Sequence, residues 1–483
     1  MLKRLKTNRG KLLDMQKIFY KPEDRWFGDC MPFFNEEDQT FYLFHQRDTR
    51  KPEPLTDPFG WSLVTTKDFV NFKDYGEVLP KGPHDAADQF IYAGSVTQGK
   101  DDKIAFYTGH NRQAKLAKKT SEILMTATSK DLIHWNKMGK ASSLIPQSGY
   151  DHNDWRDPVV VYSAEHKSYI LVLGARLPSD KKKPTGRLVY FESPDMKNWA
   201  FKGDFWTPNE FNMIEMPDLF EIGDNWYLLF SEYSEDKRTK YRISQHLFGN
   251  WHSLNDEFFD GKAYYAARSV GNEKAGRYLS GWVATKENND DLGNWDWGGA
   301  FVPHQIVQRK DKTLGVTLPQ TIIDNFAKVE IIPSFEMGEA NGKNEHTVIN
   351  EVPEQFLVEA QVEVLEDTKE FGMKAFVNDE TREGYQYKVS KPEHALKFSR
   401  TPNYPWPQYF DVGLERPISL EKGKTYDIKL IVDGSIIIIY VNNIALSARM
   451  YHKTGKELSF FVTEGKVAVS NIKYYTEWQD TVR

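Results

Sequence analysis

Three carboxylic side chains stand out in this sequence: Asp29, Asp157 and Glu215. Each is flanked by apolar residues, has a proline close behind it, and precedes a short aromatic–aliphatic run by about ten to twelve residues. Carboxylates that crowd into one partly buried cleft repel one another, and their pKa values move apart. One acid can then donate a proton to a leaving oxygen while another, still ionised, attacks carbon. This is the chemistry of glycosidic bond cleavage.

A single acid of this kind more often caps a turn or pairs with a nearby arginine. We favour a catalytic interpretation because three acids keep one spacing to a repeated element. Cys30 is interpreted as a buried structural thiol, since a nucleophilic role would need a histidine to generate thiolate. His152 is interpreted as a loop residue or a substrate contact, because no second histidine falls at ligand spacing. We therefore expect neither a metal nor another cofactor.

A repeat in the first two-thirds of the chain must position these acids. Short strands with polar turns, and no sustained helical period, predict β structure. Five units of about four strands each predict a five-bladed β-propeller, with an irregular β-sandwich as the alternative. The aromatic–aliphatic run occurs five times: Phe41–Phe44, Ile104–Tyr107, Tyr169–Val172, Trp226–Phe230 and Tyr278–Trp282. A polar turn that ends in an aromatic residue follows four of these runs: Thr66–Phe72, Ser129–Trp135, Pro194–Trp199 and Leu247–Trp251.

The pattern changes after about residue 325. Phe326–Asn344 has scattered charges and several glycines, and we interpret it as a connector. Apolar and polar residues then alternate, as in Phe356–Val364, and two later apolar runs meet across the hairpin turn Asp433–Ser435. The sequence thus predicts an all-β protein, with a propeller catalytic domain over 1–335 and a β-sandwich accessory domain over 346–483.

The net charge and the aromatic content indicate which kind of ligand the protein binds. The chain has 483 residues and a net charge of −6, which does not favour nucleic-acid binding. Its 13 Trp, 24 Tyr and 30 Phe residues suit sheet cores and sugar-binding clefts. The basic segment Met1–Lys6 is not followed by an apolar run, and no stretch is long enough to cross a bilayer. We expect a cytoplasmic enzyme, monomeric or homodimeric, that acts on a small carbohydrate.

Several motifs resemble those of one enzyme family, and the resemblance spans nearly the whole chain. Trp155–Pro158 resembles an Arg-Asp-Pro motif, Glu215–Phe220 a Glu-Cys-Pro-Asp-Leu-Phe block, and Tyr92–Ser95 a Phe-Ser-Gly-Ser segment. Asp29 with Phe41–Gln46 is similar to the family's nucleophile and the glutamine after it. The family is glycoside hydrolase family 32, which contains invertases, fructan β-fructosidases and sucrose-6-phosphate hydrolases.

The resemblance implies roles for particular residues. Asp29 would be the nucleophile, Glu215 the general acid/base, and Asp157 the transition-state stabiliser with Arg156 as its neighbouring cation. A retaining mechanism would follow, with the paired acids about 5–5.5 Å apart. The candidates for the pocket wall, for whose aromatic members core packing is an equal alternative, are Gln46, Trp61, Tyr92 and Trp282.

The sequence departs from the family pattern beside the nucleophile. The family's Asn-Asp-Pro-Asn-Gly motif is here Gly28–Pro32, which keeps only the acid, and Met216 replaces a cysteine. The resemblance therefore implies a β-fructofuranosidase of open specificity. The alternatives are a furanosidase for another sugar such as arabinose, a fructosyl transferase, and a non-catalytic carbohydrate-binding propeller.

Overall fold

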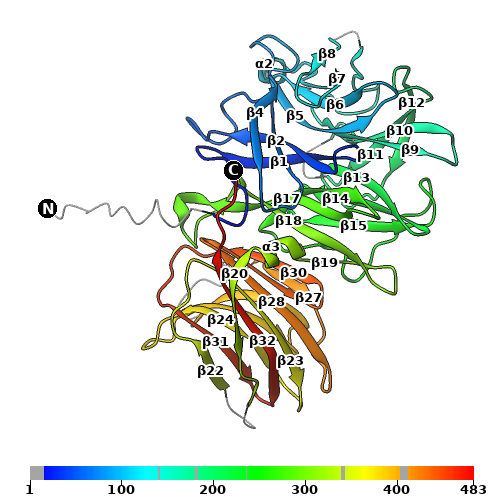
Figure 1. The fold of residues 1–483 in the computed structure, drawn as a ribbon. Helices are drawn as coiled ribbons and strands as arrows, with labels where there is room; N and C mark the ends of the chain where they lie inside the picture. The colour runs from blue at the N-terminus through cyan, green and yellow to red at the C-terminus, as the bar shows by residue number, and fades with distance from the viewer. Residues whose placement is uncertain are drawn as a thin grey trace.

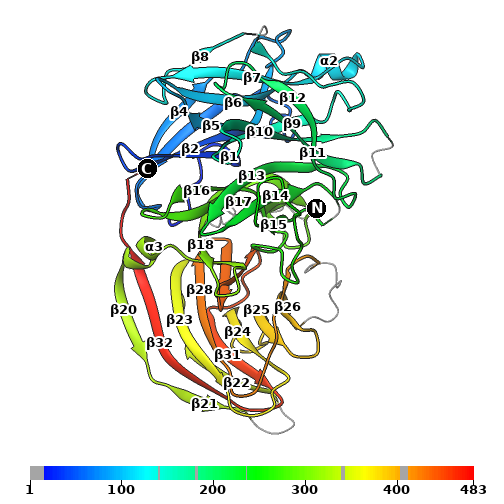
Figure 2. The ribbon, with the colours of Figure 1, turned by 90° about the vertical axis from the view of Figure 1, so that its right-hand side faces the viewer.

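The computed structural model describes residues 16–139, 142–179, 183–234, 236–338, 343–402 and 412–482, so the segment Met1–Lys6 lies outside the described part. Strands dominate these ranges, and the helices within them are short turns: α2 (Arg112–Leu116), η2 (Glu287–Asn289) and α3 (Gln320–Asp324). In the described part, no helix is long and apolar enough to span a membrane. Figures 1 and 2 show a propeller, coloured blue to green, stacked on a sandwich coloured mainly yellow to red.

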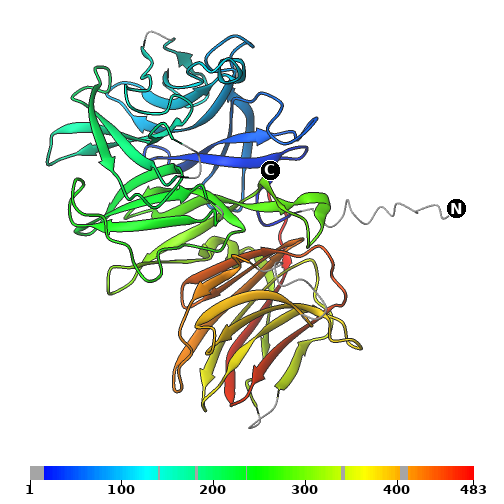
Figure 3. The same cartoon turned by 180° about the vertical axis from the view of Figure 1, so that it is seen from behind.

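The predicted five-bladed propeller is confirmed. The first strands of the five blades, β1, β5, β9, β13 and β16, pack side by side in that order, and β16 returns to β1. One residue pair, Phe27↔Gly299, also joins the first and last blades, whose strands lie next to each other in Figure 3. The strands of blades one to three are β1 (Trp26–Asn35), β2 (Thr40–Asp48), β3 (Trp61–Thr66), β4 (Lys73–Leu79), β5 (Phe90–Gln98), β6 (Lys103–His110), β7 (Glu122–Ser129), β8 (Asn136–Lys137), β9 (Trp155–Ser163), β10 (Ser168–Arg176), β11 (Gly186–Ser193) and β12 (Ala200–Trp206). Those of blades four and five are β13 (Ile214–Ile222), β14 (Asn225–Glu232), β15 (Thr239–Ser244), β16 (Tyr264–Asn272), β17 (Gly276–Lys286), β18 (Trp295–Gln308) and β19 (Leu314–Thr317).

Both repeated sequence elements have a fixed place in a blade. The aromatic–aliphatic runs form the second strands β2, β6, β10, β14 and β17, where large apolar side chains fill the contacts between blades. The polar turn joins the third strand to the fourth. Its aspartate (Asp68, Asp131 or Asp195) accepts hydrogen bonds from backbone N–H groups two and three residues later. Such Asx turns let a short polar side chain replace missing backbone partners.

Blade four shows what happens when that turn is lost. Its copy, Leu247–Trp251, has no aspartate at the corresponding place. No regular fourth strand follows β15 in the described part, and isolated bridges such as Ile243↔His252 and Lys240↔Phe258 replace it. The expected unit of about four strands is therefore reduced to three here.

The carboxy-terminal unit is the predicted sandwich of two antiparallel sheets, whose layers are visible in Figure 2. One sheet contains β20 (Phe326–Ile332), β21 (Phe335–Met337), β23 (Gln355–Val364), β28 (Thr425–Asp433), β29 (Ile436–Val441), β30 (Ile444–Arg449) and β32 (Val467–Trp478). The other contains β22 (Lys343–Ile349), β24 (Glu370–Val377), β25 (Gly384–Ser390), β26 (Ala395–Thr401), β27 (Glu415–Pro417) and β31 (Glu457–Thr463).

The segment expected to be a connector already belongs to the sandwich. β20 and β21 pair with β32, so the strands of this unit begin before residue 346. β20 is an edge strand, and most of its side chains are exposed. A strand with little to bury carries no clear apolar alternation, which is why its sequence resembled a connector.

A buried polar cluster joins the propeller to the sandwich. Asp260, just before β16, accepts bonds from the Ser447 backbone N–H at 2.7 Å and from the Ser447 hydroxyl at 2.6 Å. His304 of β18 lies 3.2 Å from Asp260 Oδ2, and its other ring nitrogen lies 2.8 Å from the Tyr440 hydroxyl. Arg449 adds bonds from the sandwich to the carbonyl oxygens of Val283 and Ala284. The two units therefore share one hydrogen-bonded interior.

We expect Asp260→Ala to lower the free energy of unfolding by about 3–5 kcal/mol, because it leaves His304 and Ser447 buried without their partner. Thermal unfolding followed by circular dichroism would measure the change. Asp101→Ala, at an exposed turn before β6, is the matched control, and its expected effect is within about 0.5 kcal/mol. Equal melting temperatures for the two variants would contradict this account of the interface.

Candidate active site

The five inner strands share a β-bulge at one level of the propeller. In blades one, three, four and five, two residues of the inner strand lie opposite one residue of the second strand. In blade two, Ala93 is a single extra residue. A bulge bends its strand and redirects side chains, so five bulges at one level gather side chains from five blades. The paired bulge residues are Gly28–Asp29, Asp157–Pro158, Met216–Pro217 and Ala266–Ala267.

The three predicted acids all lie at these bulges, but not at equivalent positions. Asp29 is the second bulge residue of β1, Asp157 is the first of β9, and Glu215 directly precedes the bulge of β13. Asp157 has φ +63° and Met216 has φ +52°, values that most non-glycine residues avoid. Backbone conformations of this kind persist where surrounding contacts hold them, and they are frequent at functional sites.

The electrostatic surroundings of Asp29 are strongly perturbing. Its Oδ1 atom accepts a hydrogen bond from the indole N–H of Trp282 at 3.1 Å. Removal from water, together with the charges of Asp157 and Glu215, raises the pKa of Asp29 to about 8. The residue as a whole is partly exposed.

Asp157 is buried and firmly held. Its Oδ2 atom accepts a bond from the backbone N–H of Met216 at 3.0 Å, and its own N–H donates to the Thr108 hydroxyl at 2.9 Å. Burial raises the pKa of Asp157, the Arg156 guanidinium lowers it and the charge of Glu215 raises it. The resulting pKa is about 6. The side chain is thus a fixed acceptor that links its own strand to the neighbouring strand of Glu215.

Glu215 is held by donors on both carboxyl oxygens. Its Oε1 atom accepts two bonds from Arg156, from Nη2 at 2.8 Å and from Nε at 3.2 Å. Its Oε2 atom accepts a bond from the Tyr265 hydroxyl at 2.8 Å. Donors on both oxygens together fix the plane of the carboxyl group as well as its position.

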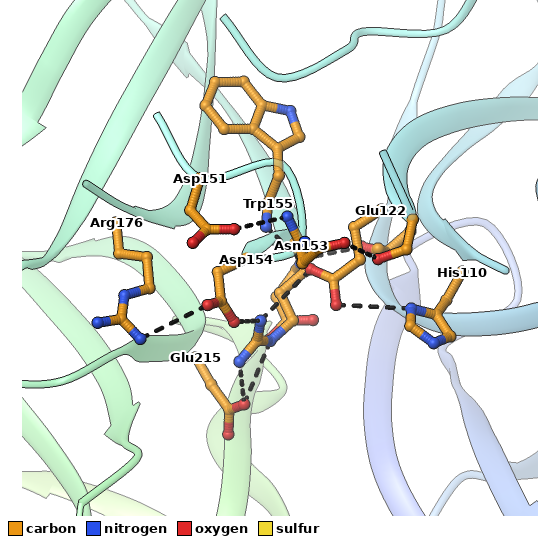
Figure 4. Close-up of polar contacts among 12 residues, drawn as sticks. His110, Glu122, Asp151, Asn153, Asp154, Trp155, Arg176 and Glu215 are labelled. Carbon is orange, nitrogen blue, oxygen red and sulfur yellow. Dashed lines mark hydrogen bonds and ion pairs between the residues drawn. The ribbon is translucent and has the colours of Figure 1, made fainter. Parts of the chain in front are cut away.

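Arg156 is the centre of a larger charged cluster. Figure 4 shows the carboxylates of Glu122, Asp154 and Glu215 gathered around one guanidinium group. Burial alone lowers the pKa of Arg156, but these carboxylates raise it well above its usual value. Burial likewise raises the pKa of Glu122, yet Arg156 and His110 bring it below its usual value. Arg156 therefore stays charged, and Glu122 and Asp154 fix its direction.

The predicted wall residues divide into two groups. Trp282 bonds directly to Asp29, and Tyr92 is partly exposed on β5, where its ring stacks on His110 at 4.5 Å. Gln46 lies opposite the Gly28–Asp29 bulge, but it is buried and its amide points to the Ile91 carbonyl at 3.4 Å. Trp61 is wholly buried, and its N–H donates to the Tyr92 carbonyl at 3.0 Å. Trp282 therefore contacts Asp29 directly, and Tyr92 is partly exposed to solvent. Gln46 and Trp61 are buried and bond to backbone carbonyl groups instead.

Sequence reasoning missed two residues of this centre, Tyr265 and Arg268, which flank the bulge of β16. Tyr265 bonds to Glu215, and Arg268 donates to the carbonyl oxygens of Gly94 at 2.6 Å and Asp157 at 2.8 Å. Arg268 thereby ties the inner strands of blades two, three and five together. The aromatic run of blade five, Tyr278–Trp282, was recognised in the sequence. The segment just before it, which forms the inner strand, could therefore have been searched for site residues in the same way as in the other blades.

The arrangement suits acid–base and nucleophilic chemistry on a small polar ligand. A carboxyl group with a raised pKa lies near a second one whose two oxygens are both held, and aromatic side chains stand beside them. In the described ranges, no group of three or more His, Cys, Asp or Glu side chains is arranged to hold a metal ion.

Comparisons with known proteins add independent findings. The model described as "Glycosyl hydrolases family 32 N-terminal domain" matches residues 19–316, and "Glycosyl hydrolases family 32 C terminal" matches residues 334–476. The chain is 22% identical to a sucrose-6-phosphate hydrolase of Escherichia coli, over 95% of this chain and 93% of that protein. It is also 22% identical to a levanase of Bacillus subtilis, over 94% of this chain and 69% of that protein.

Solved structures show the same fold. A sucrose-6-phosphate hydrolase from Lactobacillus gasseri superposes with a TM-score of 0.77 at 17% identity, covering 98% of this chain and 94% of that one. A fructan 1-exohydrolase from Cichorium intybus superposes with a TM-score of 0.76 at 16% identity, covering 97% and 98%.

Proposed function

The chain belongs to glycosyl hydrolase family 32 and is a glycoside hydrolase of the β-fructofuranosidase type, and from this premise we propose how its site works. It cleaves the terminal fructosyl bond of sucrose-like or fructo-oligosaccharide substrates with retention, through a covalent intermediate on Asp29. One observation carries the proposal: Asp29, Asp157 and Glu215 meet at a single level of inner-strand bulges. The cytoplasmic location and the monomeric or homodimeric state stay predictions.

In the first step, the ionised Asp29 carboxylate attacks the anomeric carbon. Glu215 donates its proton to the glycosidic oxygen, the carbon–oxygen bond breaks, and the alcohol or sugar leaves. In the second step, the Glu215 carboxylate takes a proton from water, the water oxygen bonds to the anomeric carbon, and Asp29 leaves as a carboxylate. These are the two displacements of a retaining glycosidase.

The surroundings of each acid support its role. Trp282 orients the Asp29 carboxyl group through Oδ1. Tyr265 can donate to the Glu215 carboxylate or accept from its acid form, because a hydroxyl does both. Asp157, held by the Met216 N–H, is placed to accept bonds from sugar hydroxyls that strengthen as positive charge develops on the ring.

Product analysis tests the proposed substrate. The purified enzyme would be incubated with sucrose, sucrose 6-phosphate, levan and inulin oligosaccharides, and released sugars would be separated by chromatography. We expect free fructose from at least one of them. Because the Gly28–Pro32 segment departs from the family motif, an arabinofuranoside belongs in the same panel. Arabinose release without fructose would replace the proposed substrate, longer fructosides would indicate transfer, and no product at all would favour a binding propeller.

The raised pKa of Asp29 predicts a distinctive pH dependence. A nucleophile reacts in its ionised form, so with fructosyl fluoride, whose fluoride leaves without a proton from Glu215, kcat/KM should rise with pH through the acidic limb as Asp29 loses its proton. Since the pKa of Asp29 is raised to about 8, we expect this limb to extend well above the usual range of an aspartate. Initial rates at low substrate concentration would measure it. A value of kcat/KM that is already constant from about pH 5 upward would contradict the perturbed nucleophile.

A further inference from the structure

We propose that Trp297 of β18 determines substrate specificity in this site, by packing its indole ring against the apolar face of the terminal sugar. This rests on the proposed function, since it assigns a binding partner to the same terminal unit. The ring lies where a side chain at residue 28, next to the nucleophile, would otherwise be.

The space above Gly28 is filled by this indole ring. A Cβ atom built on Gly28 would lie 2.0 Å from Cη2 of Trp297, and 2.6 and 2.7 Å from two further ring carbons. Real Cβ atoms do not approach other atoms below 3.0 Å. Gly28 is therefore required by the position of Trp297, and the six-membered ring rests on the backbone directly before Asp29.

Neighbouring groups hold the ring in this place. It stacks on Phe59 with centroids 6.2 Å apart and an interplanar angle of 11°. It also lies 5.8 Å from the ring of Trp282, whose N–H bonds to Asp29. Arg50 donates to the carbonyl oxygens of Trp297 at 2.8 Å and Gly298 at 3.1 Å, which fixes the backbone of the segment. Trp297 thus belongs to a rigid wall, and rigid walls bind at a low cost in conformational entropy.

Exposure separates Trp297 from Trp61 and Trp282. Trp61 and Trp282 are buried, with 0% and 3% of their surface exposed, whereas Trp297 is partly exposed. A ring with free surface next to a partly exposed nucleophile can contact a bound ligand. The part of a sugar that suits an aromatic surface is its uncharged face of C–H groups, while its hydroxyl edge faces the acids. The site therefore selects an uncharged terminal ring by its shape and apolar face.

Steady-state kinetics on the wild type and four variants tests the proposal. Trp297→Ala should raise KM by about tenfold, and Trp297→Phe should restore most of the affinity, because the smaller ring still packs. Gly28→Ala should also raise KM, since its methyl group must push the wall away. In the double variant, Gly28→Ala should add nothing to the effect of Trp297→Ala, because the clash is gone.

The controls separate this proposal from the proposed function. Trp251→Ala, at a partly exposed tryptophan after β15, should leave KM unchanged. Thermal unfolding would show that each variant is folded under assay conditions. If the wild type releases no fructose, the proposed function fails. If the wild type is active but KM is unchanged in Trp297→Ala, or if the Gly28 and Trp297 effects add independently, the role of Trp297 is overturned.

Discussion

Asp29→Asn is expected to lower kcat on the order of 10⁴-fold or more while leaving the fold intact, because the amide cannot form the covalent intermediate. The substitution keeps the shape of the side chain and an oxygen that can accept from Trp282. Stopped assays of fructose release would measure the loss. Asp195→Asn, in the Asx turn between β11 and β12, is a control at an aspartate far from the bulges and should retain activity. Unchanged turnover in Asp29→Asn would remove this residue from the mechanism.

The same variant should be more stable than the wild type at alkaline pH. The pKa of Asp29 is raised from 3.8 to about 8 in the folded protein, so its protonated form suits the fold better. Stability contributed by this group is complete below about pH 4 and is lost as pH rises through about 8. Asparagine never ionises and escapes that loss. The melting temperatures of the two proteins should therefore coincide below about pH 4, diverge as the pH rises from about 4 to about 8, and stay apart above that. A wild type more stable than the variant at alkaline pH would contradict the buried charge.

Glu215→Ala is expected to lower kcat/KM for sucrose by about 10²–10⁴-fold, the usual contribution of a general acid. The loss should be far smaller in the first step with fructosyl fluoride, because fluoride leaves without protonation. Added azide should then restore turnover, since this small anion can attack the intermediate without a general base. An equal loss with both substrates, and no rescue by azide, would contradict the role of Glu215.

Much of the propeller could be predicted because its repeated residues act through contacts that are close in the sequence. The aromatic–aliphatic runs are second strands, and Asp68, Asp131 and Asp195 close identical turns. The missing aspartate near Leu247 coincides with the reduced fourth blade. The sandwich hairpin at Asp433–Ser435 was equally plain. By contrast, β20 could not be predicted, because an exposed edge strand needs no apolar pattern.

The site was only partly predictable for a related reason. Asp29, Asp157 and Glu215 follow from their spacing, but the bulges that shift them by one residue from blade to blade depend on pairing with second strands. The fork from Arg156 to Glu215 joins residues 59 positions apart. The contact between Trp297 and Gly28 is more distant still, and Gly28 alone indicated only a departure from a motif. Contacts between blades form only when the propeller closes, so the sequence alone does not reveal them.

The most direct test of the central claim is to trap the covalent intermediate. Glu215→Ala would be mixed with fructosyl fluoride, quenched in acid within the first turnover, digested and mapped by mass spectrometry. We predict that the peptide containing Asp29 gains the mass of one fructosyl unit, with fragmentation placing it on that side chain. An adduct on Asp157 or another residue, or rapid turnover with no adduct at any time, would contradict the double displacement through Asp29.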